Sequence, residues 1–172
     1  ADALADSFAR NASRPAVRAG GRTYDHAEYG ALVHAFARRL LEQGVGPDVA
    51  VAVAVPRSVE MLVAIHGIVL AGGTYVPIDP EAPAEVVRRQ LALSGASTVV
   101  VAGARPSWAE AASTVPETFV TVDLDALATA ASAPLTPADR PVALRAGHPV
   151  YTLFTSGSTG QPKGVTVTHR GL

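Results

Sequence analysis

The run of alternating valine and alanine from Val49 to Val55 constrains the fold more than any other segment of this sequence. Valine is β-branched and favours an extended strand, and no position in the run carries a charge. Both faces of such a strand are apolar, so both must be covered by other elements. The run therefore predicts a strand inside a parallel sheet that has helices on both of its faces.

The segments that follow this run alternate between helical and extended patterns. Ser58 is a suitable N-cap for a helix that Gly72 would end. In chain order, we expect a helix over 58–71, a strand over 74–79, a helix over 84–93 and a strand over 98–101. Connections of this type are almost always right-handed and join parallel strands. Residues 48–101 are thus expected to form a doubly wound α/β architecture.

The clearest single helix of the sequence begins nearer the N-terminus. Asp25 with Glu28 three residues later is a capping pattern, and the apolar stripe that follows it stops at Gly44. Outside these regions we expect a helix over 4–12, hairpin strands over 16–19 and 22–25, a strand over 118–122 and a surface connection over 135–144.

Charge and composition exclude several classes of function. Fourteen Lys and Arg residues against fifteen Asp and Glu give a net charge of -1, so the chain has no basic field for nucleic acid or an anionic membrane. Cysteine is absent, which excludes disulfides and thiolate metal sites. The longest uninterrupted apolar run is far shorter than the ~20 residues that span a membrane. We expect a soluble, cytoplasmic protein without nucleic-acid or membrane partners.

The segment from Thr155 to Gly164 has the composition of a phosphate-binding loop. It lies between strand-like segments over 150–154 and 165–168, and it contains three glycines, four hydroxyl side chains and Lys163. Glycines let backbone N–H groups turn toward a ligand, hydroxyls donate without adding charge, and the ammonium balances anionic charge. Lys163 is the only lysine among the fourteen Lys and Arg residues, which indicates that a compact ammonium is needed there.

Other interpretations of these residues are open. The segment is not a Walker A loop, because that pattern places Gly directly before the Lys, whereas Pro162 precedes Lys163. From composition alone, a flexible connection rich in Gly, Ser and Thr is an alternative to a phosphate site. The five histidines show no metal-ligand spacing, and His66, on an apolar helix, is expected to be packed or hydrogen-bonded. No metal site is assigned.

Several stretches resemble motifs of the adenylate-forming enzymes, and within them of the amino-acid-activating adenylation domains of nonribosomal peptide synthetases. The family's phosphate-binding signature is similar to FTSGSTGQPKG at 154–164, and its usual continuation is similar to VTVTHRGL at 165–172. Two earlier family motifs resemble, in the family's order, RTYDHAEYGAL at 22–32 and AGGTYVPIDP at 71–80. The peptide-synthetase branch is favoured over the fatty-acyl and aryl ligases by YVPIDP and THRGL.

The sequence departs from the family's usual residues at three positions. Leucine, lysine and tyrosine usually stand where this chain has Tyr29, Leu70 and Phe154. None of the three is a donor of the loop, so we interpret them as packing variation.

The resemblance implies an α/β fold, namely a partial N-terminal lobe of an adenylate-forming enzyme with βαβ units and a strand-loop-strand phosphate-binding hairpin. Residues 1–172 would be the early part of the large N-terminal subdomain of an adenylation domain, without its C-terminal subdomain. The implied activity is a ligase that forms aminoacyl-AMP from an amino acid and MgATP and passes the acyl group to a carrier-protein thiol. This portion alone is expected to be inactive.

The resemblance also implies cofactors and partners. The cofactors are ATP and Mg²⁺, and the partners are the remainder of the domain, a peptidyl carrier protein and a condensation domain, with a small accessory activator protein as a further option. Two alternatives stay open: an acyl-CoA or aryl-acid ligase of the same superfamily, and a non-catalytic docking lobe.

Within the loop, the resemblance assigns Lys163 as the catalytic residue, since its ammonium would neutralise the departing pyrophosphate. The hydroxyls would donate to the phosphates, and the glycines would allow close backbone approach. Donors that are fixed where charge grows in the transition state lower the barrier most. The expected nucleotide-binding residues are Thr155, Ser156, Gly157, Ser158, Thr159, Gly160, Lys163 and Gly164.

Overall fold

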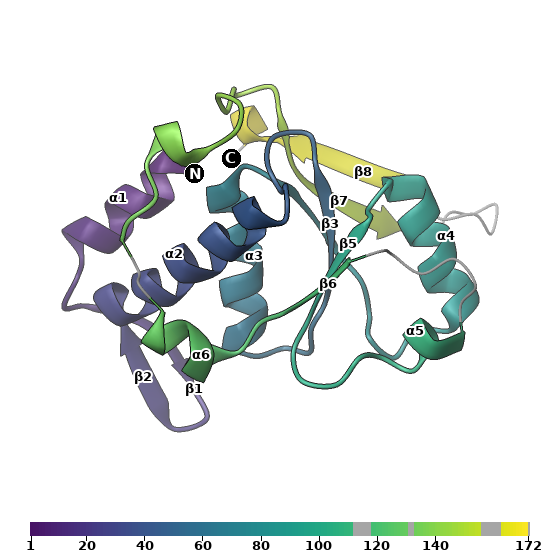
Figure 1. Ribbon diagram of the computed structural model, residues 1–172, viewed down its shortest axis with the longest axis horizontal. Helices are drawn as coiled ribbons and strands as arrows, with labels where there is room; N and C mark the ends of the chain where they lie inside the picture. The colour runs from purple at the N-terminus through teal and green to yellow at the C-terminus, as the bar shows by residue number, and fades with distance from the viewer. Residues whose placement is uncertain (112–117, 131–132, 156–162, 172) are drawn as a thin grey trace.

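The computed structural model describes residues 1–111, 118–130, 133–155 and 163–171, and a six-stranded sheet forms its centre (Figure 1). The strands are β3 (Ala50–Ala54), β4 (Thr74–Pro77), β5 (Thr98–Val101), β6 (Thr118–Thr121), β7 (Pro149–Thr155) and β8 (Lys163–Thr168). Their order across the sheet is β6-β5-β3-β4-β7-β8. All neighbouring strands are parallel except β8, which pairs antiparallel with β7. The predicted α/β class is confirmed.

Helices cover both faces of this sheet, as the valine and alanine run predicts. The helices are α1 (Asp2–Arg10), α2 (His26–Glu42), α3 (Val59–Ala71), α4 (Ala84–Ser94), α5 (Trp108–Ala111) and α6 (Leu124–Thr129). In β3, Val51 and Val53 belong to the core that α1, α2, α3 and α6 share, whereas Ala52 and Ala54 belong to the core under α4 and α5. Figure 1 shows these two groups of helices on opposite sides of the sheet.

The ends of the helices have the predicted capping residues. The Asp25 side chain accepts a hydrogen bond of 2.8 Å from the backbone N–H of Glu28, and α2 begins directly after it. Ser58 likewise accepts from the N–H of Met61 at the start of α3. Gly72 ends α3 with a φ of 92°, a left-handed conformation that glycine adopts without strain.

The helices α2 and α3 pack closely because a glycine lies at their contact. A Cβ at Gly67 of α3 would lie 2.7 Å from Cδ1 of Phe36, whose side chain on α2 is completely buried. The missing side chain therefore makes room for the aromatic ring.

The N-terminal hairpin was predicted correctly, but the stretch between β5 and β7 was predicted incompletely. Strands β1 (Pro15–Ala19) and β2 (Arg22–Asp25) pair as expected. No pattern in the sequence indicated the short helices α5 and α6 or the 3-10 turns η1 (Pro137–Asp139) and η2 (His169–Gly171). These elements are too short to show an apolar period.

The segment over 135–144, which we expected to be a surface connection, makes buried long-range contacts. The buried Leu135 donates its N–H to Nδ1 of His34 at 3.0 Å. Arg140, whose side chain is only 4% exposed, donates to the carbonyl of Leu70 at 3.0 Å and to Asp2 at 2.9 Å. These long-range contacts fix the chain against α1, α2 and α3 before it enters β7.

Within the described residues, no helix is both long and apolar enough to cross a membrane.

Candidate functional site

The carboxyl ends of the parallel strands meet at one edge of the sheet, and the predicted phosphate loop starts there. Strand β7 runs parallel to β4 and ends at Thr155, and β8 returns from Lys163. In open α/β sheets, ligands bind outside the carboxyl ends of the strands. The topology thus brings the beginning and end of the loop to the edge where a ligand is expected.

The same edge contains a topological switch point between β3 and β4. The helix that follows β3, α3, packs on one face of the sheet, and the helix that follows β4, α4, packs on the other. Connections that leave neighbouring strands in opposite directions open a crevice between them. Because β7 is the next strand beyond β4, the end of β7 lies beside this crevice.

Thr155 and Lys163 are directly paired across the two strands. Their Cα atoms are register partners, and Oγ1 of Thr155 donates to the Lys163 carbonyl at 3.5 Å, a long and weak hydrogen bond. Both residues are exposed. The pair therefore presents a hydroxyl and an ammonium to solvent at the carboxyl edge, which suits an anionic ligand.

Gly164 follows in the same strand and faces an aromatic ring. A Cβ at this position would lie 3.2 Å from Cε1 of Phe154 and 3.3 Å from Cγ2 of Thr152. The other predicted loop residues lie outside the described residues: Ser156, Gly157, Ser158, Thr159 and Gly160.

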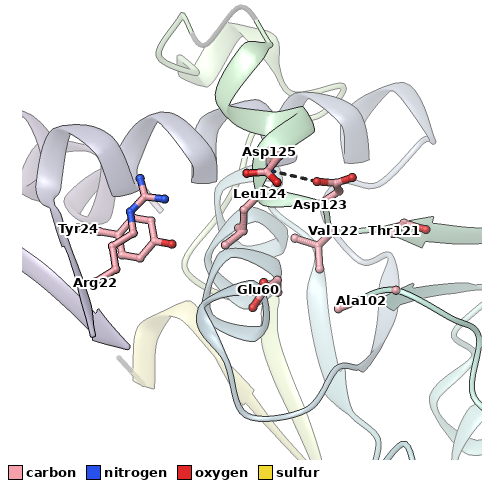
Figure 2. Close-up of a pocket in the computed structure, with 10 residues that line it drawn as sticks. Arg22, Tyr24, Glu60, Ala102, Thr121, Val122, Asp123, Leu124 and Asp125 are labelled. Carbon is pink, nitrogen blue, oxygen red and sulfur yellow. Dashed lines mark hydrogen bonds between the residues drawn. The ribbon is translucent and has the colours of Figure 1, made fainter. Parts of the chain in front are cut away.

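A second concave site, of about 360 Å³, lies at the carboxyl ends of β5 and β6. Figure 2 shows Arg22 and Tyr24 of β2 on one side of it and Asp123 and Asp125 near α6 on the other. Asp123 accepts from the N–H groups of Asp125 and Ala126, so its carboxylate caps α6. Strands β3 and β4 separate this pocket from β7. This pocket was not predicted from the sequence, in which an Asp directly after a predicted strand was its signal.

Tyr29 and Leu70, two of the three departures from the family's usual residues, are fully packed. Tyr29 is 2% exposed, and its hydroxyl is 2.7 Å from Nδ1 of His66. Burial raises the pKa of Tyr29 and lowers that of His66. His66 is therefore the hydrogen-bonded packing residue that we predicted. The third departure, Phe154, is partly buried against the core under α4.

No cluster of three or more His, Asp or Glu side chains suited to a metal ion occurs in the described ranges.

The chain belongs to the family of AMP-binding enzymes, because the sequence profile of that family matches residues 4–172. Within that family it groups with the N-terminal portion of nonribosomal peptide synthetase adenylation domains. It is 37% identical to chondramide synthase cmdD of Chondromyces crocatus over 99% of this chain and 4% of the relative. It is 36% identical to the phosphinothricin tripeptide synthetase PhsC of Streptomyces viridochromogenes over 98% of this chain and 15% of the relative.

Solved structures agree with this assignment. The nonribosomal peptide synthetase FmoA3, in its α-methyl-L-serine-AMP bound form, matches with a TM-score of 0.81 and 32% identity over 99% of this chain and 18% of that chain. The N-terminal domain of FACL13 from Mycobacterium tuberculosis matches with a TM-score of 0.80 and 25% identity over 96% of this chain and 43% of that chain. The chain thus spans less than half of each of these proteins.

Proposed function

We propose that this chain forms part of an adenylation domain that activates an amino acid as aminoacyl-AMP and passes the acyl group to a carrier-protein thiol. The observation that supports this most directly is the Thr155 and Lys163 pair at the carboxyl edge of the parallel sheet. Because relatives with the same sequence pattern are peptide synthetases, the amino acid is the substrate class that we propose.

In the first step that we propose, an amino-acid carboxylate oxygen attacks the α-phosphorus of ATP. The bond from that phosphorus to the bridging oxygen breaks, and pyrophosphate leaves with the electron pair. In the second step, the carrier thiol loses its proton and its sulfur attacks the acyl carbon. The bond from the acyl carbon to the phosphate oxygen then breaks, AMP leaves with the electron pair, the thiol proton passes to water, and a thioester remains.

Lys163 would carry out the neutralising role in the first step. Negative charge accumulates on the pyrophosphate as it departs, and an exposed ammonium at the strand end can bind it more strongly than ground-state ATP. Thr155 would donate its hydroxyl to a phosphate oxygen, since its bond to the Lys163 carbonyl is weak and easily exchanged. Mg²⁺, bound with the ATP phosphates, would supply further positive charge. The remaining loop positions, Ser156, Gly157, Ser158, Thr159, Gly160 and Gly164, would contribute the other hydroxyl and backbone contacts.

The proposal includes the place of the chain in its protein. Residues 1–172 would be the early part of the large N-terminal subdomain, and activity would need the remaining parts of the domain. A peptidyl carrier protein and a condensation domain would be its partners, as in multidomain relatives, and a small accessory activator protein would be a further one. We propose a cytoplasmic location for the reaction, because it would use ATP.

An acyl-CoA or aryl-acid ligase is the second candidate. An acidic residue placed to bind a substrate ammonium in the rest of the domain would separate the two. A docking lobe without catalysis would bind no ATP in the complete protein.

Replacing Lys163 with Ala in the complete enzyme tests the proposal. We expect amino-acid-dependent exchange of pyrophosphate into ATP to fall by at least roughly a hundredfold, as for loss of a charged group at an oxyanion. Arg39→Ala, which removes an exposed cation on α2, is the matched control and should leave the exchange unchanged. Equal exchange in Lys163→Ala and the wild type would contradict the assignment.

A further inference from the structure

We propose that Phe154 is a positioning residue, whose ring lies over Gly164 and sets the register at which Lys163 enters the phosphate-binding site. The inference rests on the proposed function, because it concerns the same site. Phe154 and Gly164 are Cα partners one step inside the Thr155 and Lys163 pair.

The contact is close, and a larger residue at Gly164 would require the Phe154 ring to shift. Cε1 and Cζ of the Phe154 ring lie 3.2 and 3.6 Å from the position of a Cβ on Gly164. Gly164 is not among the glycines with a positive φ, so its backbone conformation does not require glycine. The structure therefore gives a packing reason for glycine at this position. An aromatic side chain that covers a glycine on the neighbouring strand is a known means of stabilising strand register.

The ring also connects this point to the rest of the protein. Phe154 packs against the core under α4, which includes Ala54 of β3 and Ile78 after β4. By contrast, the first four residues of β8, Lys163 to Thr166, are exposed. Phe154 thus links the start of an otherwise exposed strand to buried residues at the carboxyl edge of the sheet.

Side-chain alternation explains why this ring acts on Lys163 without touching it. Successive residues of a strand point to opposite faces, so Phe154 and Gly164 lie on one face and Thr155 and Lys163 on the other. Thr152 and Thr166, which share a hydrogen bond of 2.8 Å, lie on the Phe154 face. A slip of β8 by one residue would move Lys163 to the wrong face. The ring over Gly164 opposes that slip, because any other residue of β8 would place a side chain where the ring lies.

The test compares two matched substitutions in the complete enzyme. Phe154→Leu should lower kcat/KM for MgATP in pyrophosphate exchange by roughly tenfold, since small displacements of a charged group are costly. KM for the amino acid should stay within about twofold, and Phe154→Tyr, which keeps the ring, should retain wild-type values. Phe119→Leu is the control, because Phe119 packs against the same core from the distant strand β6. The inference would be overturned if Phe154→Leu and Phe119→Leu lowered kcat/KM for MgATP equally. It would also be overturned if Phe154→Leu changed only the melting temperature.

A double-mutant cycle tests the contact itself and does not depend on one variant folding well. Gly164→Ala alone should lower kcat/KM for MgATP, because the ring must shift to admit the methyl group. In a Phe154→Leu background the same change should cost several-fold less, as expected for residues in direct contact. Additive penalties would refute the contact. Unchanged pyrophosphate exchange in Lys163→Ala would instead contradict the proposed function. The failure of the inference and the failure of the proposed function are therefore distinguishable.

Discussion

The hydroxyl of Tyr29 and Nδ1 of His66 are 2.7 Å apart, and their hydrogen bond joins α2 to α3 beneath the sheet. The two rings also meet nearly edge to face, with their centroids 5.8 Å apart. Tyr29 is almost completely buried, so its hydroxyl needs a hydrogen-bond partner within the protein, and His66 supplies it. The pair is therefore part of the scaffold that supports the sheet.

Tyr29→Phe should destabilise the protein by about 1 kcal/mol, because it removes the hydrogen bond between the Tyr29 hydroxyl and Nδ1 of the half-buried His66. Chemical denaturation at neutral pH measures this change in the free energy of unfolding. In the double variant Tyr29→Phe with His66→Leu, the decrease in the free energy of unfolding should be smaller than the sum of the two single decreases, since both members of the pair are then removed. Strict additivity would show that the two side chains act independently.

Acid should weaken the fold through the buried histidines. Burial lowers the pKa of His66 and, together with Arg38, that of His34 below their ordinary value of 6.5. The unfolded chain therefore binds more protons than the folded protein as the pH falls through 6.5. The stabilisation by the neutral histidines is complete above this value and is lost below it. His34 would also lose its role as acceptor for the N–H of Leu135 when Nδ1 is protonated.

The measurement is the free energy of unfolding between about pH 7.5 and about pH 5. We expect it to decrease over this interval, and His66→Gln should reduce the slope because glutamine does not titrate. A slope that is the same in His66→Gln and in the wild type would contradict the contribution of His66.

Gly67→Ala should destabilise the protein by about 1–3 kcal/mol, as overpacking of a close contact usually does. The new methyl group would lie 2.7 Å from Cδ1 of the buried Phe36, so either the ring or α3 must move. Gly147→Ala is the matched control, because a Cβ there meets no atom within 4 Å. Thermal unfolding of both variants compares them, and equal melting temperatures would show that the α2 and α3 contact tolerates a methyl group.

Local patterns in the sequence predicted the parts of the fold that depend on local chemistry. The valine and alanine run, the N-caps Asp25 and Ser58, and the C-cap Gly72 all appear where expected. Arg140 could not be interpreted in this way, since its partners Leu70 and Asp2 are far from it in the sequence.

In the candidate site, too, local features were predicted from the sequence and long-range contacts were not. Composition identified Lys163 as unusual, and the structure places it opposite Thr155 at the carboxyl edge. Phe154 was interpreted as packing variation, because its relation to Gly164 depends on the register of two strands and on the size of a ring. A sequence can indicate which side chains a site contains. The contacts that hold those side chains in place depend on how β7 pairs with β8, which the sequence does not show.

The position of β7 in the sheet has a consequence for how the protein is made. Tyr75 of β4 pairs with Tyr151 of β7, although β5 and β6 are synthesised between them. During synthesis on the ribosome, one edge of β4 therefore stays unpaired until β7 emerges. Pairing of strands so far apart in the sequence is slow. The two strand ends that bear Thr155 and Lys163 consequently come together only after the rest of the sheet is available to receive them.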